Sequence, residues 1–128
     1  MRCLLDSHLL VWSLTGDKRV EKYREILLSP DNEIYFSAVS IWEIALKHAL
    51  GKLEVDPDTA LDAGMKQGFR SLNMTGEHAC YAGRVSKETN NKDPFDNLLI
   101  SQAKYEGMGF LTGDRRILST DDPCIIRV

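Results

Sequence analysis

Several features that define common classes of protein are missing from this sequence. No apolar run approaches the ~20 residues of a transmembrane helix, and Asp6 interrupts an initial apolar segment that is too short for a signal peptide. The three cysteines, Cys3, Cys80 and Cys124, have no CxxC spacing, which favours reduced thiols over a disulfide framework or a zinc site. We therefore expect a cytoplasmic protein that makes no membrane contact.

The motifs of several well-defined active sites are also absent. Neither GxGxxG nor GxxxxGKS/T occurs, which disfavours dinucleotide and P-loop nucleotide binding. GxSxG is missing, and the three histidines lack the spacing of a zinc site. With a net charge of −3, the chain has no overall basic field to attract nucleic acid. A polyphosphate ligand would have to be held locally, by a metal ion and a few lysine or arginine side chains.

What the sequence does contain is a regular alternation of short apolar runs and amphipathic stretches. Its 128 residues, 43% of them hydrophobic, are enough for one domain (residues 1–128) with one core. The apolar runs predict strands at residues 2–5, 33–36, 70–74, 109–111 and 124–127. The amphipathic stretches predict helices at residues 7–14, 20–28, 37–50, 59–67, 75–88, 95–105 and 115–118. Asp58 is the expected N-cap of the helix at 59–67, and residues 89–93 are an expected loop. This order predicts an α/β fold: a twisted parallel sheet of about four to five strands, flanked by helices on both faces.

Acidic residues stand where such a fold would gather them. Asp6 and Asp114 follow predicted strands, and Asp96 opens a predicted helix. Parallel strands place their carboxyl ends at one edge of the sheet, where ligands bind, and carboxylates gathered there repel one another unless a cation neutralises them. Oxygen ligands suit Mg²⁺ or Mn²⁺, so the pattern indicates a divalent-metal site. Ser7 and Thr112, beside the acids, could hold a carboxylate or a bound water by hydrogen bonds.

Each acid also has an ordinary structural explanation. Asp6, Asp93 and Asp114 could be helix N-caps, and Asp96 would suit the positive end of a helix dipole. Glu43 stands four residues before a lysine, the spacing of a common surface pair. Independent caps, however, need not converge on one edge. Four basic residues near the acids form a solvated face by default, with phosphate contact as the alternative: Arg84, Lys87, Lys92 and Arg115.

Four ordered motifs cover nearly the whole chain: LLDSHLLVWSLTGD (4–17), SAVSIWEIALKHALGKL (37–53), DPFDNLLISQA (93–103) and FLTGDRRI (110–117). Together they resemble the PIN-domain ribonucleases, and specifically the VapC-type toxins of bacterial toxin–antitoxin pairs. Two positions depart from the usual pattern: Ser7 replaces a more common threonine but keeps the hydroxyl, and Asn97 stands where arginine is common. The departure at Asn97 removes any RNA or carboxylate contact that an arginine would make there.

The resemblance implies a PIN-like domain with catalytic, metal-binding carboxylates at Asp6, Glu43, Asp96 and Asp114, and Asp93 as an auxiliary ligand. It also implies Mg²⁺ or Mn²⁺ as cofactor, hydrolysis of RNA, a homodimer, and inhibition by a small VapB-type antitoxin in a hetero-oligomer. One alternative is a PIN-like module that has lost catalysis and binds RNA or serves as a scaffold. A phosphoacceptor receiver domain fits poorly, because a single Asp ends the first strand and no suitable late lysine follows.

Overall fold

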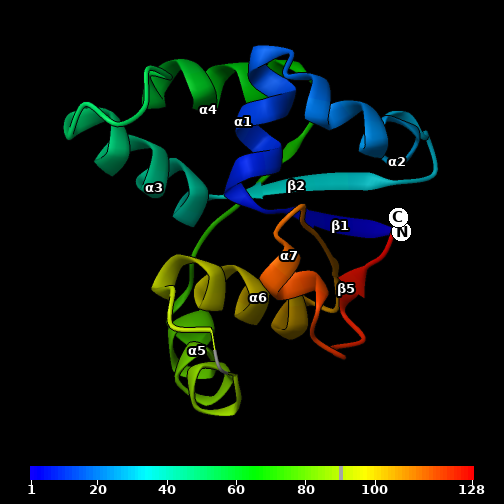
Figure 1. Cartoon of the computed structure of the whole chain (residues 1–128), viewed down its shortest axis with the longest axis vertical. Helices are drawn as coiled ribbons and strands as arrows, with labels where there is room; N and C mark the ends of the chain where they lie inside the picture. Colours follow the sequence, from blue (N-terminus) through cyan, green and yellow to red (C-terminus); the bar gives the residue numbers. More distant parts are fainter. Residues whose placement is uncertain (90) are drawn as a thin grey trace.

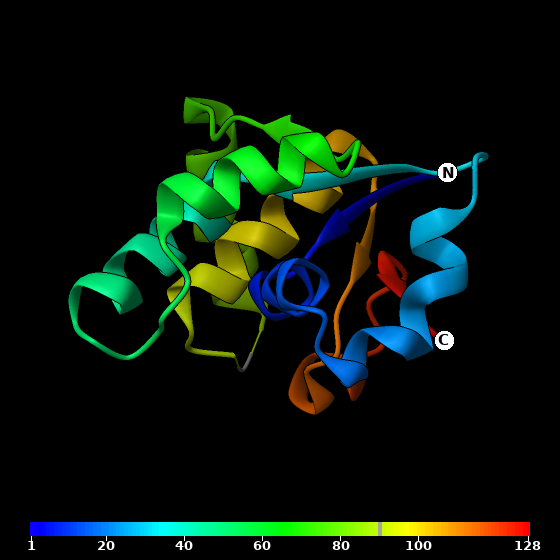
Figure 2. The same cartoon turned by 90° about the horizontal axis from the view of Figure 1, so that it is seen from above.

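The described residues, 1–89 and 91–128 of the computed structural model, form a sheet in which every strand runs parallel to its neighbours. The strands are β1 (Arg2–Leu5), β2 (Glu33–Ser37), β3 (Arg70–Leu72), β4 (Gly109–Leu111) and β5 (Ile125–Ile126). They pair in the order β3-β2-β1-β4-β5. In Figure 2, β2, β1 and β4 run in progressively rotated directions, the twist that L-residues impose on a sheet. The predicted α/β fold with a parallel sheet is confirmed.

Helices cover both faces of the sheet (Figure 1). Helices α1 (Ser7–Thr15), α2 (Arg24–Leu28) and α4 (Pro57–Lys66), with the 3₁₀ helix η1 (Lys18–Tyr23), lie on one face. Helices α5 (Gly76–Glu88), α6 (Pro94–Glu106) and α7 (Arg115–Leu118) lie on the other. Helix α3 (Ala38–Ala49) continues from the carboxyl end of β2 and contributes to both cores. Because side chains alternate along a strand, Leu5 of β1 enters the first core and Leu4 the second.

Two local predictions are wrong. The stretch 20–28 is not one helix: η1 ends at Tyr23, whose φ of −106° and ψ of 0° interrupt the α-helical path before α2 begins. The Tyr23 side chain is buried, and its hydroxyl lies 3.5 Å from the carbonyl oxygen of Thr112 beyond β4. The N-cap of α4 is Asp56 and not Asp58, because Pro57 occupies the first helical turn. The predicted loop 89–93 includes residue 90, which lies outside the described residues.

The strand order reverses direction between β1 and β4, because the chain adds β2 and β3 on one side of β1 and β4 and β5 on the other. In an open α/β sheet such a switch point leaves a crevice at the carboxyl ends of the strands. Asp6 follows β1 and Thr112 follows β4, so both residues border this crevice. None of the helices that the structure describes has the length and apolar character of a membrane span.

Candidate active site

Asp6 is buried at the centre of the switch point, with 2% of its surface exposed. It is the N-cap of α1: one carboxylate oxygen accepts a hydrogen bond of 2.7 Å from the backbone N–H of Leu9. The other oxygen accepts a hydrogen bond from the Thr112 hydroxyl, and the Asp6 N–H donates to the Leu111 carbonyl at 3.0 Å. These bonds fix the Asp6 carboxylate between the ends of β1 and β4.

Asp93 and Asp96 occupy the start of α6. Asp93 is the N-cap, and its carboxylate accepts from the N–H groups of Phe95 at 2.9 Å and Asp96 at 3.3 Å. Asp96, in the first turn, is freed from capping, so its own carboxylate is available to other groups. It accepts a hydrogen bond of 3.2 Å from the Asn91 side-chain amide. The cap therefore positions Asp96, while Asp93 satisfies the backbone of the first turn.

Asp114 is the N-cap of α7 and the third acid of the group. Its carboxylate accepts from the Arg116 N–H at 2.8 Å and forms an ion pair with the Arg116 guanidinium at 3.1 Å. Its own N–H donates to the Thr112 hydroxyl oxygen at 3.0 Å. Thr112, which is 1% exposed, thus joins Asp6 and Asp114 through a single hydroxyl group.

The charges of the other acids act on Asp96. The pKa of Asp96 is raised to about 6, first by burial and then by the charges of Asp93, Asp114 and Asp6, while the Asn91 amide acts in the opposite direction. Burial raises the pKa of Asp6, although the Thr112 hydroxyl and the Leu9 N–H oppose the change. Partial burial acts to raise the pKa of Asp114, but Arg116 outweighs it and leaves that pKa below its usual value. Acids from three distant segments are therefore close enough to interact.

Glu43 lies on α3 and lines a groove together with Ser7 and His8, the two residues that follow Asp6. It is 7% exposed, and its carboxylate pairs with Lys47 one turn later at 2.8 Å. Ser40, one turn before Glu43, accepts a hydrogen bond of 2.9 Å from the Ser7 hydroxyl. The Ser7 hydroxyl is thus bound to α3, and its predicted supporting role at the carboxylates stays a prediction. No hydrogen bond or ion pair between described residues joins Glu43 to Asp6, Asp96 or Asp114.

Aromatic packing holds α3 against the start of α6. The rings of Trp42 and Phe95 lie with their centroids 5.1 Å apart, and these residues directly precede Glu43 and Asp96. Sequence reasoning did not connect Trp42 with the acids. No local pattern could have done so, because the contact joins residues more than fifty positions apart.

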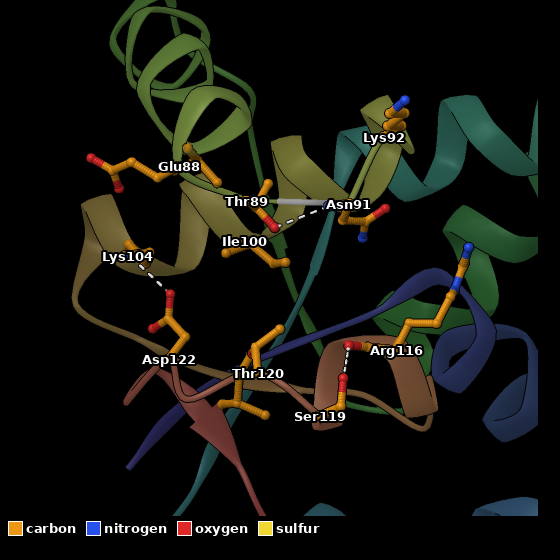
Figure 3. A pocket seen from close by; sticks show the side chains of 12 residues that line it. Glu88, Thr89, Asn91, Lys92, Ile100, Lys104, Arg116, Ser119, Thr120 and Asp122 are labelled. Carbon is orange, nitrogen blue, oxygen red and sulfur yellow. Dashed lines mark hydrogen bonds and ion pairs between the residues drawn. The ribbon is translucent and has the colours of Figure 1, made fainter.

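Two grooves flank the carboxylates. The larger, of about 880 Å³, runs between α5, α6, α7 and β5, and its lining includes Asn91, Lys92, Lys104 and Arg116. In Figure 3, Asn91, Lys92 and Arg116 lie toward one end of this groove, and Lys104, paired with Asp122 at 2.8 Å, lies toward the other.

The smaller groove, of about 280 Å³, lies beside Glu43 and carries basic side chains that sequence reasoning missed: His8, Arg19, Lys47 and Lys52. Of the four basic residues for which the sequence left phosphate contact as the alternative to a solvated face, Lys92 lines the larger groove. Arg84, Lys87 and Arg115 are exposed and line neither groove.

The oxygen atoms of these three aspartates are of the chemical type that binds a hard divalent cation. Asp6, Asp96 and Asp114 present carboxylate oxygens, the ligands that Mg²⁺ and Mn²⁺ prefer, and their mutual effect on the pKa of Asp96 is the repulsion that a cation relieves. Within residues 1–89 and 91–128, however, no three His, Cys, Asp or Glu side chains form a ready-made ligand group. The residues therefore fit a cation by type, burial and charge, and their side chains must shift to coordinate one.

Comparison with known proteins identifies the family. A family model described as PIN domain matches residues 3–123, whereas no curated protein matches the chain in sequence. Among solved structures, VapBC2 from Rickettsia felis bound to a promoter DNA fragment gives a TM-score of 0.75 at 18% identity, covering 98% of this chain and 96% of that one. DNA-bound VapBC from Salmonella typhimurium gives 0.68 at 16% identity, with 98% and 95% covered. VapBC-1 from nontypeable Haemophilus influenzae gives 0.62 at 16% identity, with 92% and 93% covered. At these identities the similarity shows a shared fold.

Proposed function

Because the chain belongs to the PIN domain family, we propose that it is a metal-dependent endoribonuclease that hydrolyses RNA phosphodiester bonds. The observation that supports this most directly is the convergence of Asp6, Asp96 and Asp114 at the switch point of the sheet. Carboxylates gathered so closely that their charges raise the pKa of Asp96 reduce the stability of the folded protein unless a bound cation or substrate compensates. A structural role alone does not explain why these residues meet.

In the proposed reaction, Asp6, Asp96 and Asp114 would hold Mg²⁺ or Mn²⁺, with Asp93 as an auxiliary ligand. The chemistry that such a cation supplies when bound is a more acidic water and neutralisation of charge on the scissile phosphate. Glu43 orients the cluster or accepts a proton from the attacking water. The Thr112 hydroxyl keeps the Asp6 carboxylate in place.

The grooves on the two sides of the carboxylates supply a path for a single strand of RNA. Since the chain is acidic overall, phosphate contacts must come from local basic side chains. We assign this role to Lys92 in the larger groove and to Lys47 and Lys52 in the smaller one. Phosphate contact by Arg84, Lys87 and Arg115, the alternative that the sequence left open for these residues, stays a prediction.

We further propose that the protein acts in the cytoplasm as the toxin of a toxin–antitoxin pair, as a homodimer bound and inhibited by a VapB-type antitoxin. The structural neighbours described as VapBC complexes support this proposal. An apolar stripe along α3 and its C-cap also supports it: Trp42 and Leu46 on the helix and Leu50 at the cap are exposed at intervals of four residues, as expected of a surface that another chain covers.

The enzymatic proposal is tested with the purified chain, free of antitoxin, incubated with RNA in Mg²⁺, in Mn²⁺ and in excess EDTA. We expect cleavage with either metal and none in EDTA. RNA binding without cleavage under every metal condition would contradict the proposal and support the alternative, a PIN-like module that binds RNA but has lost catalysis.

A further inference from the structure

Arg116 lies between two of the proposed metal ligands. Its guanidinium pairs with Asp114 at 3.1 Å and reaches Asp96 at 4.0 Å, while its side chain remains 72% exposed. Asp114 belongs to the segment after β4 and Asp96 to α6. The guanidinium therefore bridges carboxylates from two separate elements, at the end of the larger groove that contains Asn91 (Figure 3).

Part of this arrangement is a local capping motif, as a second copy in the same chain demonstrates. Asp17 caps η1 and binds Arg19, two residues later, through both the backbone N–H at 2.9 Å and the guanidinium at 2.7 Å. Arg19 then packs 4.5 Å above the ring of Trp12, away from any second carboxylate in the described chain. Only Arg116 extends the motif to an acid on another helix. Its contact with Asp96 is consequently not explained by capping.

The charge balance around the acids gives this contact its significance. Asp6, Asp93 and Asp114 lie close enough to Asp96 for their charges to raise its pKa. Among the described residues, Arg116 is the one lysine or arginine that forms ion pairs with these four carboxylates, one with Asp96 and one with Asp114. The oxygens it contacts are those a divalent cation would need. A guanidinium and a metal ion cannot use the same oxygens in the same place, because both are positively charged.

We infer that Arg116 is the internal counter-ion of this carboxylate group, and that a divalent cation displaces its guanidinium from Asp96 and Asp114 in order to bind. The inference rests on the metal-dependent function proposed above. Displacement is feasible because the side chain is exposed, and exposed ion pairs break at little cost. Arg116 thus lowers the affinity of the site for metal and offsets part of the negative charge of Asp96 and Asp114 when no metal is bound.

The experiment is a calorimetric titration of the purified chain with Mn²⁺ at 0.15 M salt, comparing wild type with R116Q, R115Q and D6N. R116Q removes the charge but keeps the backbone N–H that Asp114 caps, so we expect the fold to survive, which circular dichroism and thermal unfolding will check. R115Q is the matched control: it removes the same charge one residue away, where no ion pair with a described carboxylate exists. We expect R116Q to bind Mn²⁺ about fivefold more tightly than wild type. R115Q should change by less than about twofold because salt screens its more distant charge, and D6N should lose binding.

Two results would overturn the inference while leaving the proposed function intact. One is Mn²⁺ binding by R116Q that is equal to or weaker than that of wild type. The other is an equal gain in R116Q and R115Q, which would reveal a general charge effect. Failure of wild type and R116Q alike to bind Mn²⁺ is a different outcome: it would remove the proposed metal site, and this inference with it.

Discussion

Replacing Thr112 by valine removes one hydroxyl group that two buried partners share. The hydroxyl donates to the buried Asp6 carboxylate and accepts from the Asp114 N–H at 3.0 Å, and Thr112 itself is 1% exposed. A hydrogen bond to a charged group contributes about 1.5–3 kcal/mol, and a buried donor left unpaired costs a further ~1–3 kcal/mol. We expect T112V to lower the free energy of unfolding by about 3 kcal/mol, a large share of the ~5–15 kcal/mol of a typical domain.

Urea denaturation followed by circular dichroism measures this effect, with T112S as the control. Serine keeps the hydroxyl and loses only a methyl group, so T112S should cost about 1 kcal/mol. The difference between the two variants should also depend on pH. The Thr112 hydroxyl opposes the rise of the Asp6 pKa, so without it that pKa rises further, and the penalty grows as pH increases through the Asp6 pKa. Equal stability of T112V and T112S from pH 4 to pH 8 would refute the reasoning.

Two further predictions concern the acids and the core. D96N should stabilise the protein at pH 8 by about 1–2 kcal/mol and have no effect at pH 3. The pKa of Asp96 is raised to about 6 in the folded protein, so ionisation of this carboxyl lowers the free energy of unfolding as pH rises above the pKa of the unfolded state. Denaturation curves at both pH values test this, and a gain in stability at pH 3 would contradict it. G64A should destabilise the fold by about 1–3 kcal/mol despite the helix propensity of alanine, since the added Cβ would lie 2.9 Å from the ring of Phe36. The control is G83A on α5, where a Cβ meets nothing within 4 Å; it should be neutral or stabilising, and thermal unfolding of both variants measures the contrast.

The order of elements and the caps of three helices could be predicted from the sequence because they depend on neighbours in the chain. Asp6, Asp93 and Asp114 cap α1, α6 and α7, as their flanking residues indicate. Their grouping followed from parallel topology, which sends every carboxyl end of a strand to one edge. Capping a helix and belonging to the acidic group are therefore not alternatives. Asp6 and Asp114 each cap a helix and also meet at the Thr112 hydroxyl beside the switch point.

Contacts between distant elements could not be predicted in this way. The break at Tyr23 depends on a side chain that reaches Thr112, 89 residues later in the chain. The bridge from Arg116 to Asp96 requires α6 and α7 to be neighbours, and the sequence favoured Arg115 for a site role with no means of separating it from Arg116. The Asp-x-Arg spacing at residues 17–19 and 114–116 could have predicted the ion pair between each aspartate and its own arginine. It could not have predicted the contact of Arg116 with Asp96.

The central claim, that Asp6 belongs to a metal-dependent hydrolytic site, is tested most directly by comparing RNA cleavage by D6N and D56N. Both variants replace the aspartate that caps a helix, α1 in one case and α4 in the other, and both remove one negative charge. With Mg²⁺ or Mn²⁺ present, D56N should cleave RNA like the wild type, whereas D6N, folded by circular dichroism, should lose cleavage by at least about a hundredfold. Wild-type cleavage rates in D6N would contradict the account.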